Sequence, residues 1–321
     1  MVVVDRSTAR HSTEQCGTSK VNASCALVFS TDENFAGLAK GLVLSLAASA
    51  NEGEFALHMV DIGCSDATLA WMQAHGVRIG KFDRCKFLRA PKAKLKPYQE
   101  AQLCRPFLRE LFPGFETYIW CDSDIWIQDI HSVRLYRDIA NAEPTLVPIS
   151  PLVDVSYSYF YEDCAEFVNY ARHWYSSTYG EVVASTYASR AVLSSGLFAM
   201  HSSNPIWSAW ASELDNIFQR TFESHDAVHL AEQTALNYLL YANKCFVPIE
   251  ATHNYNCHVG RLVRRNNEVV VSDLPWRKIG VVHLTYSSRM MGEYIDQRLL
   301  YQAGDYLTAN ELSQLRMLSH Y

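Results

Sequence analysis

Short apolar runs alternate with longer stretches of helical periodicity through the first half of the chain. The runs at residues 25–29 and 55–60 have the length and composition of buried strands. We expect helices at residues 35–50 and 66–75, and Ser65 stands at the N-cap position of the second. Strands and helices that alternate at these lengths predict βαβ units and a largely parallel sheet.

The second half of the chain continues this pattern. Further buried strands are expected at three apolar runs, residues 117–121, 193–200 and 279–284. The first of these runs would be the third strand of the chain, and it follows the turn Pro113-Gly114. Further helices are expected at residues 229–241 and 293–319.

No repeat or linker divides the chain, so a single domain is the simplest prediction. We expect an α/β domain over residues 23–292, with a mainly parallel central sheet flanked by helices. Residues 1–22 are polar and weakly patterned, and we interpret them as a leader. Residues 293–321 would form a C-terminal helical extension.

Composition narrows the class of protein. The 321 residues are 49% hydrophobic and 19% charged, which is typical of a soluble globular protein, and the net charge of −6 gives no reason to expect nucleic acid as a partner. No apolar run approaches the roughly 18 residues of a membrane span. Nine cysteines without a CxxC pair argue against a zinc ribbon, and their odd number without a secretion signal predicts reduced thiols in a cytoplasmic protein.

The sequence Asp122-Ser-Asp124 directly follows the apolar run at residues 117–121. In an extended chain, residues two apart point the same way, so both carboxylates could face one ligand. Ligands of open α/β sheets bind beyond the carboxyl ends of the strands, where this pair falls. Two adjacent carboxylates suit Mg²⁺ or Mn²⁺, which would neutralise a leaving nucleotide diphosphate. Chance alone yields roughly one Asp-x-Asp in such a chain, so the position after the strand carries this prediction.

His283 ends another apolar run, at residues 279–282. A histidine in that position is commonly a core residue with its hydrogen bonds satisfied. An imidazole at a strand end also completes a Mn²⁺ site well. The residues alone leave both interpretations open.

Several longer motifs follow one another in a fixed order between about residues 26 and 291. They are Val28-Phe-Ser-Thr-Asp-Glu-Asn-Phe35, Leu57-His-Met-Val-Asp61, Tyr118-Ile-Trp-Cys-Asp-Ser-Asp-Ile-Trp-Ile-Gln-Asp129, Ser194-Ser-Gly-Leu-Phe-Ala-Met200, Glu232-Gln-Thr-Ala-Leu-Asn237 and His283-Leu-Thr-Tyr-Ser-Ser-Arg289. In this order the motifs resemble those of glycosyltransferase family 8, the retaining enzymes that include glycogenin and bacterial lipooligosaccharide α-galactosyltransferases.

The resemblance implies a GT-A fold and a nucleotide-diphosphate sugar donor, UDP above all. It assigns the divalent metal to Asp122, Asp124 and His283. It assigns contacts with the nucleotide to Ser30, Asp32, Asn34 and Arg289. The acceptor would be a glycan, a lipid-linked glycan or a protein, and the sequence does not distinguish among them.

The family's sugar-binding positions fall on a second set of residues. Arg105 lies seventeen residues before Asp122, the spacing at which the family places an arginine that touches the donor sugar. The resemblance places Gln233 beneath the anomeric carbon and counts Glu232 beside it as catalytic. It assigns the wall of the sugar pocket to Ser194, Ser195 and Gly196.

Four positions depart from the family pattern. Ser194 replaces Asn, Glu232 replaces Asp, Tyr286 replaces Gly and Arg289 replaces Lys. An arginine can still hold a diphosphate, and it can do so bidentately. The shorter Ser194 has lost an amide donor, which leaves the identity of the donor sugar open.

Simpler structural roles exist for each of these residues taken alone. Asp32 and Asn34 could be ordinary turn formers. Arg105 precedes Pro106 and could cap a helix or pair with a surface carboxylate. Gln233 and Asn237 are one helical turn apart and could form a polar face.

Two other functions fit parts of the sequence. A sugar-nucleotide-binding module without turnover would keep the same donor site. His225 and His229 are four residues apart, the spacing of a zinc hydrolase pair, with Glu232 nearby. However, Asp226 stands where such enzymes have a glutamate, so a solvated histidine pair is the simpler interpretation.

Two further segments could bind an acceptor, a membrane or a ligand. The stretch from Lys81 to Lys96 carries seven basic residues against the single acid Asp83. It could be a solvated face, or it could attract an anionic acceptor or the inner face of a membrane. The aromatic segment at residues 157–179 could stack on a sugar or a base, or simply pack between helices.

Overall fold

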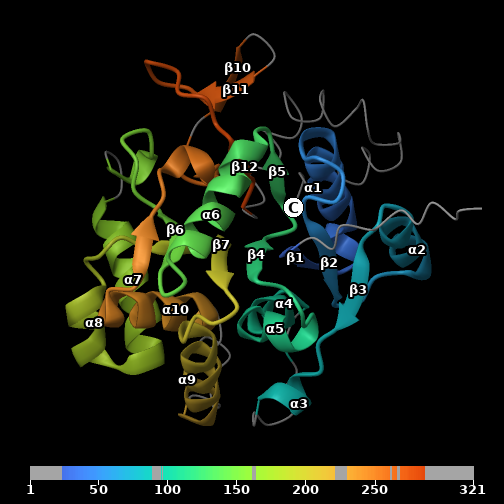
Figure 1. Ribbon diagram of the computed structural model, residues 1–321. Helices are drawn as coiled ribbons and strands as arrows, with labels where there is room; N and C mark the ends of the chain where they lie inside the picture. Colours follow the sequence, from blue (N-terminus) through green and yellow to red (C-terminus); the bar gives the residue numbers. More distant parts are fainter. Residues whose placement is uncertain are drawn as a thin grey trace, which may run out of the picture.

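A seven-stranded sheet forms the centre of the protein (Figure 1). The structure is a computed structural model that describes residues 24–88, 95, 97–160, 164–220, 230–260, 262–265 and 268–285. The strand order is β3-β2-β1-β4-β7-β6-β8. The strands are β1 Cys25–Thr31, β2 Ala56–Asp61, β3 Arg78–Lys81, β4 Thr117–Cys121, β6 Val147–Pro151, β7 Leu193–His201 and β8 Phe246–Pro248.

Most neighbouring strands of this sheet are parallel. The exception is β7, which runs antiparallel to both β4 and β6. The parallel pairs place the carboxyl ends of β1, β2 and β4 at one edge of the sheet. The predicted α/β architecture with a mainly parallel sheet is therefore confirmed.

Alternation along the strands divides the core into two layers. Cys25, Leu27 and Phe29 of β1 pack on one face of the sheet, and Ala26 and Val28 pack on the other. The first face is covered by α1 Ala36–Ser49, α2 Asp66–Ala74 and α6 Ile130–Ala142. The second face is covered by α5 Leu108–Leu111, α9 Ile206–Arg220 and α10 Ala231–Asn243.

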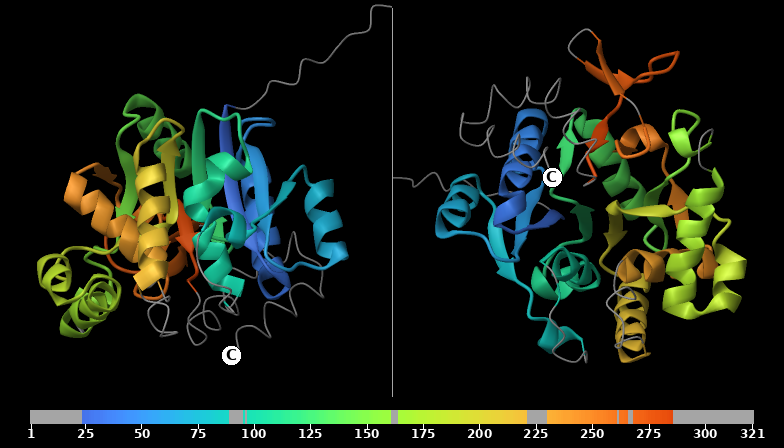
Figure 2. Two further views of the ribbon diagram at one scale, coloured as in Figure 1. Left: turned by 90° about the horizontal axis from the view of Figure 1, so that it is seen from below. Right: turned by 180° about the vertical axis from the view of Figure 1, so that it is seen from behind.

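The remaining helices are short or lie at the ends of the sheet. They are η1 Glu33–Phe35, α3 Arg84–Phe87, α4 Pro97–Leu103, η2 Arg105–Phe107, η3 Ser158–Phe160, α7 Cys164–Tyr179, α8 Glu181–Tyr187 and η5 Ala251–His253. The pair α7 and α8 lies at the opposite end of the protein from α2 and β3 in both figures (Figures 1 and 2). Within the described residues, no helix has the length and apolarity needed to cross a membrane.

Two small sheets complete the fold. One joins β5 Ile125–Ile127, β12 Val281–His283 and β9 Tyr255–Asn256. The other is the hairpin of β10 Leu262–Arg265 and β11 Glu268–Val271, which projects away from the rest of the protein (Figures 1 and 2). The run at residues 279–284 therefore contains a strand as predicted, but it pairs with β5 and β9 rather than joining the central sheet.

Local signals identified most elements. The Ser65 side chain accepts a hydrogen bond from the Thr68 backbone at 3.3 Å, which confirms the predicted N-cap. The run at residues 117–121 is the fourth strand of the chain rather than the third, because β3 was missed. That strand has only partly buried or exposed residues, so it lacks an apolar run. The predicted leader and C-terminal extension lie outside the described residues.

Candidate functional site

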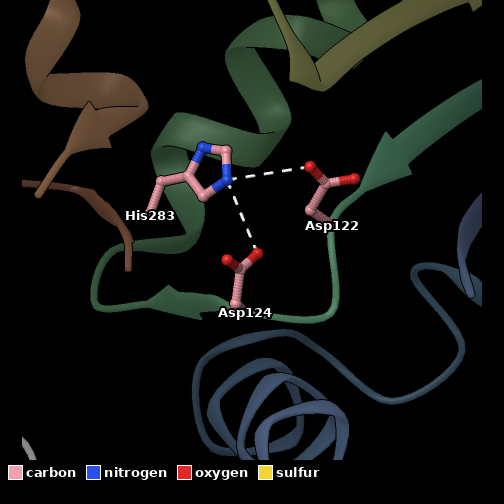
Figure 3. A group of neighbouring side chains, drawn as sticks. All are labelled: Asp122, Asp124 and His283. Atoms are coloured by element: carbon pink, nitrogen blue, oxygen red, sulfur yellow. Dashed lines mark ion pairs between the residues drawn. The ribbon is translucent and has the colours of Figure 1, made fainter. Parts of the chain in front are cut away.

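The segment Asp122-Ser-Asp124 forms a tight turn between β4 and β5 (Figure 3). The Ile125 backbone N–H donates to the Asp122 carbonyl at 3.1 Å and closes the turn, while the Asp122 N–H donates to the Gly196 carbonyl of β7 at 2.8 Å. The prediction that the two carboxylates share a direction because the chain is extended was wrong. They converge because the chain turns between them.

His283 reaches this turn through strand pairing. β12 runs antiparallel to β5, and His283 is the partner of Ile125, the first residue after the turn. Its Nε2 lies 3.7 Å from Asp122 Oδ2 and 3.5 Å from Asp124 Oδ1 (Figure 3). One ligand atom from each of the three residues lies within 4.8 Å of the others. Residues about 160 positions apart in the sequence thus meet at one point, as the resemblance predicted.

The orientation of the imidazole is set by Asn254. His283 Nδ1 lies 3.1 Å from Asn254 Oδ1, and an amide oxygen can only accept. Nδ1 therefore carries the proton, and the lone pair of Nε2 faces the two carboxylates. Asn254 Nδ2 donates in turn to Ser194 Oγ at 3.2 Å, and both residues are buried. Ser194, predicted at the wall of the sugar pocket, lines the cavity and also supports this chain.

The charges at this point favour a cation. Burial by itself lowers the pKa of His283, but the carboxylates of Asp124 and Asp122 outweigh it, and the net shift of the pKa is upward. A proton on the imidazole and a divalent cation are thus alternative ways to neutralise the two carboxylates. Two carboxylates and one imidazole form a ligand set that suits Mn²⁺. The residues therefore fit the metal that the sequence predicted.

Gly196 leaves the space that this arrangement needs. A Cβ at this position would lie 2.2 Å from His283 Cε1 and 2.8 Å from Asp122 Oδ2. Neither contact is sterically allowed, and both partners are buried or held. Gly196 was predicted to line the sugar pocket, and it does line the cavity.

Arg105 holds Asp122 from behind. Its Nη2 donates to Asp122 Oδ1 at 2.5 Å, and its Nη1 donates to Glu232 Oε2 at 2.6 Å and to Ser195 Oγ at 2.8 Å. Burial opposes its positive charge, but Asp122 and Glu232 outweigh burial and raise the pKa of Arg105. The sequence alone also allowed Arg105 to pair with a surface carboxylate. Its two partners, Asp122 and Glu232, belong to the site instead.

Glu232 lies deeper than its predicted catalytic role suggests. Its side chain is 1% exposed, and burial raises its pKa to about 7 against the opposing charge of Arg105. One carboxyl oxygen, Oε2, accepts from Arg105, and the other, Oε1, is buried without a hydrogen-bond partner in the described structure. This geometry suits a residue that positions Arg105.

Gln233, the next residue of α10, faces the cavity. Its Oε1 accepts from the Ser195 backbone N–H at 3.2 Å and lies 3.1 Å from the Ser195 hydroxyl. The other residue of the supposed polar face, Asn237, is buried and bonds both backbone groups of Leu193. Gln233 and Asn237 therefore both bind β7, but only Gln233 borders the cavity.

The cavity has a volume of about 1300 Å³ and extends from the end of β1 past the metal residues to α7. Ser30, Asp32 and Asn34, which the resemblance assigns to the nucleotide, line its β1 end. Asp32 also accepts from the backbone of Phe35 and from the amide of Asn34, so the simpler turn-forming role holds as well. The two roles are compatible, because the turn is what orients these side chains.

Arg289, Tyr286, His225 and His229 lie outside the described residues. In the described part of the basic stretch, Lys81 pairs with Asp61 and Arg84 with Glu100. The function of that stretch stays a prediction.

Sequence reasoning missed two residues of this site. Asn254 precedes His283 by 29 positions, and no motif marks it. Trp120 lies within the recognised strand, where its indole N–H donates to Asp122 Oδ1 at 2.7 Å and its ring faces the Arg105 guanidinium. The one sequence signal for the Trp120–Asp122 hydrogen bond is that a tryptophan, whose indole N–H needs an acceptor when buried, stands two residues before a carboxylate.

Comparison with known proteins identifies the fold. No protein-family model and no curated protein matches the chain. The solved structure of galactosyltransferase LgtC in complex with donor and acceptor sugar analogs is 14% identical, with a TM-score of 0.54 over 91% of this chain and 95% of that chain. The bifunctional glycosyltransferase WbbM is 13% identical, with a TM-score of 0.50 over 83% of this chain and 46% of that one.

A third similar structure is the glycosyltransferase GlyE of Streptococcus pneumoniae, 13% identical, with a TM-score of 0.50 over 93% of this chain and 64% of that chain. At these identities the likeness establishes the architecture alone. The chain has the GT-A fold of glycosyltransferases.

Proposed function

We propose that this protein is a retaining glycosyltransferase of the family 8 type, which transfers a hexose-type sugar from a nucleotide-diphosphate donor to an acceptor. One observation carries the proposal. Asp122, Asp124 and His283 bring three metal-binding atoms within 4.8 Å of one another beside a large cavity, in a fold that glycosyltransferases share.

The three residues would hold Mn²⁺ or Mg²⁺, and the imidazole favours Mn²⁺. When bound, the metal would act as a Lewis acid that neutralises the charge of the leaving diphosphate. The chain's own contribution is to fix the ligands before the donor arrives. Arg105 and Trp120 hold Asp122, and Asn254 holds the imidazole, so little reorganisation is needed at the time of reaction.

The nucleotide would occupy the β1 end of the cavity, against Ser30, Asp32 and Asn34. LgtC, whose fold is similar, was solved in complex with donor and acceptor sugar analogs, which supports a sugar donor in this cavity. UDP is the nucleotide that the family resemblance favours. Arg289 would bind the diphosphate, a role that follows from the sequence motif alone.

The donor sugar would lie between the metal and Gln233, against Ser194, Ser195 and Gly196. Arg105 is 4% exposed, so we assign it mainly to the support of Asp122, with Glu232 acting through it. Gln233 is a neutral amide at the cavity wall. It could stabilise developing positive charge at the anomeric carbon, which suits retention better than base-assisted inversion.

A donor screen tests this function. The purified protein is incubated with a panel of UDP-, GDP- and ADP-sugars and Mn²⁺, and released nucleotide is measured with and without EDTA. We expect metal-dependent release from at least one donor, with UDP-sugars first. Tight Mn²⁺-dependent nucleotide binding without any release would instead establish the non-catalytic module. If the protein neither binds nucleotide nor releases it from any donor, the proposal is refuted.

A further inference from the structure

Helix α7 carries aromatic side chains on two separate faces. Tyr175 lies on the buried face, together with Ala171, and packs toward α8. Phe167, Tyr170 and Trp174 lie on another face and line the cavity. Their spacing of three and four residues places them in one row along the helix. The aromatic segment recognised in the sequence is therefore partly core and partly cavity wall.

The cavity face of α7 is aromatic and polar at once. The Phe167 ring stacks on Tyr159 with a centroid distance of 4.3 Å, which anchors one end of the row. Tyr170 is 53% exposed, and its hydroxyl donates to Glu166 Oε1 at 3.0 Å. Glu166 and His173 line the cavity from the same helix and are exposed. This wall offers flat ring faces bordered by groups that can donate and accept hydrogen bonds.

This face of α7 lies across the cavity from the β1 end, where the nucleotide is proposed to bind. α7 follows β6, which lies on the other side of β4 and β7 from β1 in the sheet order. The Ser30 end of the cavity and the α7 wall are thus on opposite sides of Asp122 and Gln233, which line the same cavity. A donor bound at the β1 end would direct its sugar toward α7.

We propose that this face of α7 is the subsite for a carbohydrate acceptor, an inference that rests on the glycosyltransferase function proposed above. Sugar rings have C–H faces that stack on the negative faces of aromatic rings, and hydroxyl edges that Glu166 and His173 can bind. From Phe167 to Trp174 the wall runs roughly 10 Å at the rise of an α-helix. That length accommodates more than one sugar ring, which favours an oligosaccharide over a monosaccharide.

Binding to a printed array of defined oligosaccharides tests the subsite, with the full chain loaded with UDP and Mn²⁺. We expect the wild-type protein to bind a subset of the array. Tyr170→Ala and Trp174→Ala should each weaken that binding roughly several-fold or more, because each removes one aromatic contact. The matched control is Trp276→Ala, which removes a 42% exposed tryptophan that does not line the cavity.

Nucleotide release from the donor, measured in parallel without acceptor, separates this inference from the function it rests on. The subsite predicts that Tyr170→Ala and Trp174→Ala keep donor hydrolysis while losing oligosaccharide binding. If the wild type hydrolyses donor but binds no oligosaccharide, or if both variants bind like Trp276→Ala, the subsite is refuted and the transferase stands. If donor binding and hydrolysis are also absent, the proposed function has failed first. Tyr170 is already half exposed, so its variant remains informative even if Trp174→Ala fails to fold.

Discussion

Gly196 packs so closely against His283 that no side chain fits between them: a Cβ on the glycine would lie 2.2 Å from the imidazole Cε1. The same Cβ would lie 2.8 Å from Asp122 Oδ2. Gly196 belongs to β7, whereas His283 and Asp122 come from β12 and the end of β4. The absence of a side chain on one strand thus permits ligands from two others to meet.

Gly196→Ala should therefore displace the imidazole and raise the Mn²⁺ concentration needed for nucleotide release. Overpacking of this kind typically costs about 1–3 kcal/mol of stability, which thermal unfolding would measure. Gly41→Ala is the matched control, because its Cβ would meet Trp126 at an ordinary 3.7 Å within helix α1. That variant should keep wild-type metal dependence and equal or greater stability. An unchanged Mn²⁺ requirement in Gly196→Ala would show that the glycine serves only the fold.

Asp124→Asn should reduce Mn²⁺-dependent nucleotide release at least roughly hundredfold, because a carboxylate ligand is lost. Its melting temperature should stay near that of the wild type, since removing one of two adjacent charges also relieves repulsion. Asp122→Asn should lose activity equally but destabilise the fold more, because Asp122 also accepts from Arg105 and Trp120. Asp138→Asn, on the exposed surface of α6, serves as the control for loss of one negative charge. Full activity in either site variant contradicts the metal assignment.

Asn254→Leu should raise the Mn²⁺ requirement roughly ten- to a hundredfold, the usual cost of losing a hydrogen-bond partner of a metal-binding histidine. The effect should approach that of His283→Ala, which removes the ligand itself. Asn254→Asp keeps an acceptor for the Nδ1 proton of His283 and should retain the wild-type metal dependence. Titration of Mn²⁺ against nucleotide release gives all three values. If Asn254→Leu behaves like the wild type, the imidazole is oriented by its packing alone.

Much of this site could be predicted because its residues lie in motifs that are continuous in sequence. The carboxylate pair follows an apolar strand, and His283 ends another, so each was identifiable locally even though the reason given for the convergence of the carboxylates was wrong. Asn254 could not be found in this way. Its contact with His283 arises because β9 and β12 lie side by side, and nothing in its local sequence reports that pairing.

The missed strand and the two faces of α7 have a similar explanation. β3 lies at the edge of the sheet, where partial exposure removes the apolar pattern that marks a strand. On α7, the aromatic residues of the core and those of the cavity wall are of the same types. Only the tertiary structure shows that Tyr175 packs in the core and that Trp174 lines the cavity.

Stereochemistry gives the most direct test of mechanism. An inverting enzyme needs a carboxylate base on the acceptor side, whereas a retaining enzyme can use a weak nucleophile or dipole near the anomeric carbon. Two buried carboxylates that could otherwise act as a base are held in ion pairs: Asp154 accepts from Arg277, and Glu232 accepts from Arg105. Gln233 remains at the cavity wall.

We therefore expect an α-linked product from an α-linked donor, which the anomeric coupling in proton NMR would report. Gln233→Ala should lower kcat roughly tenfold or more while changing donor affinity little, since an interaction made mainly in the transition state is removed. Gln73→Ala, exposed on α2, is the control and should leave both constants unchanged. A β-linked product would refute the retaining mechanism while leaving the metal site intact. Glu166 would then be the first candidate base, because its carboxylate lines the cavity on the α7 side.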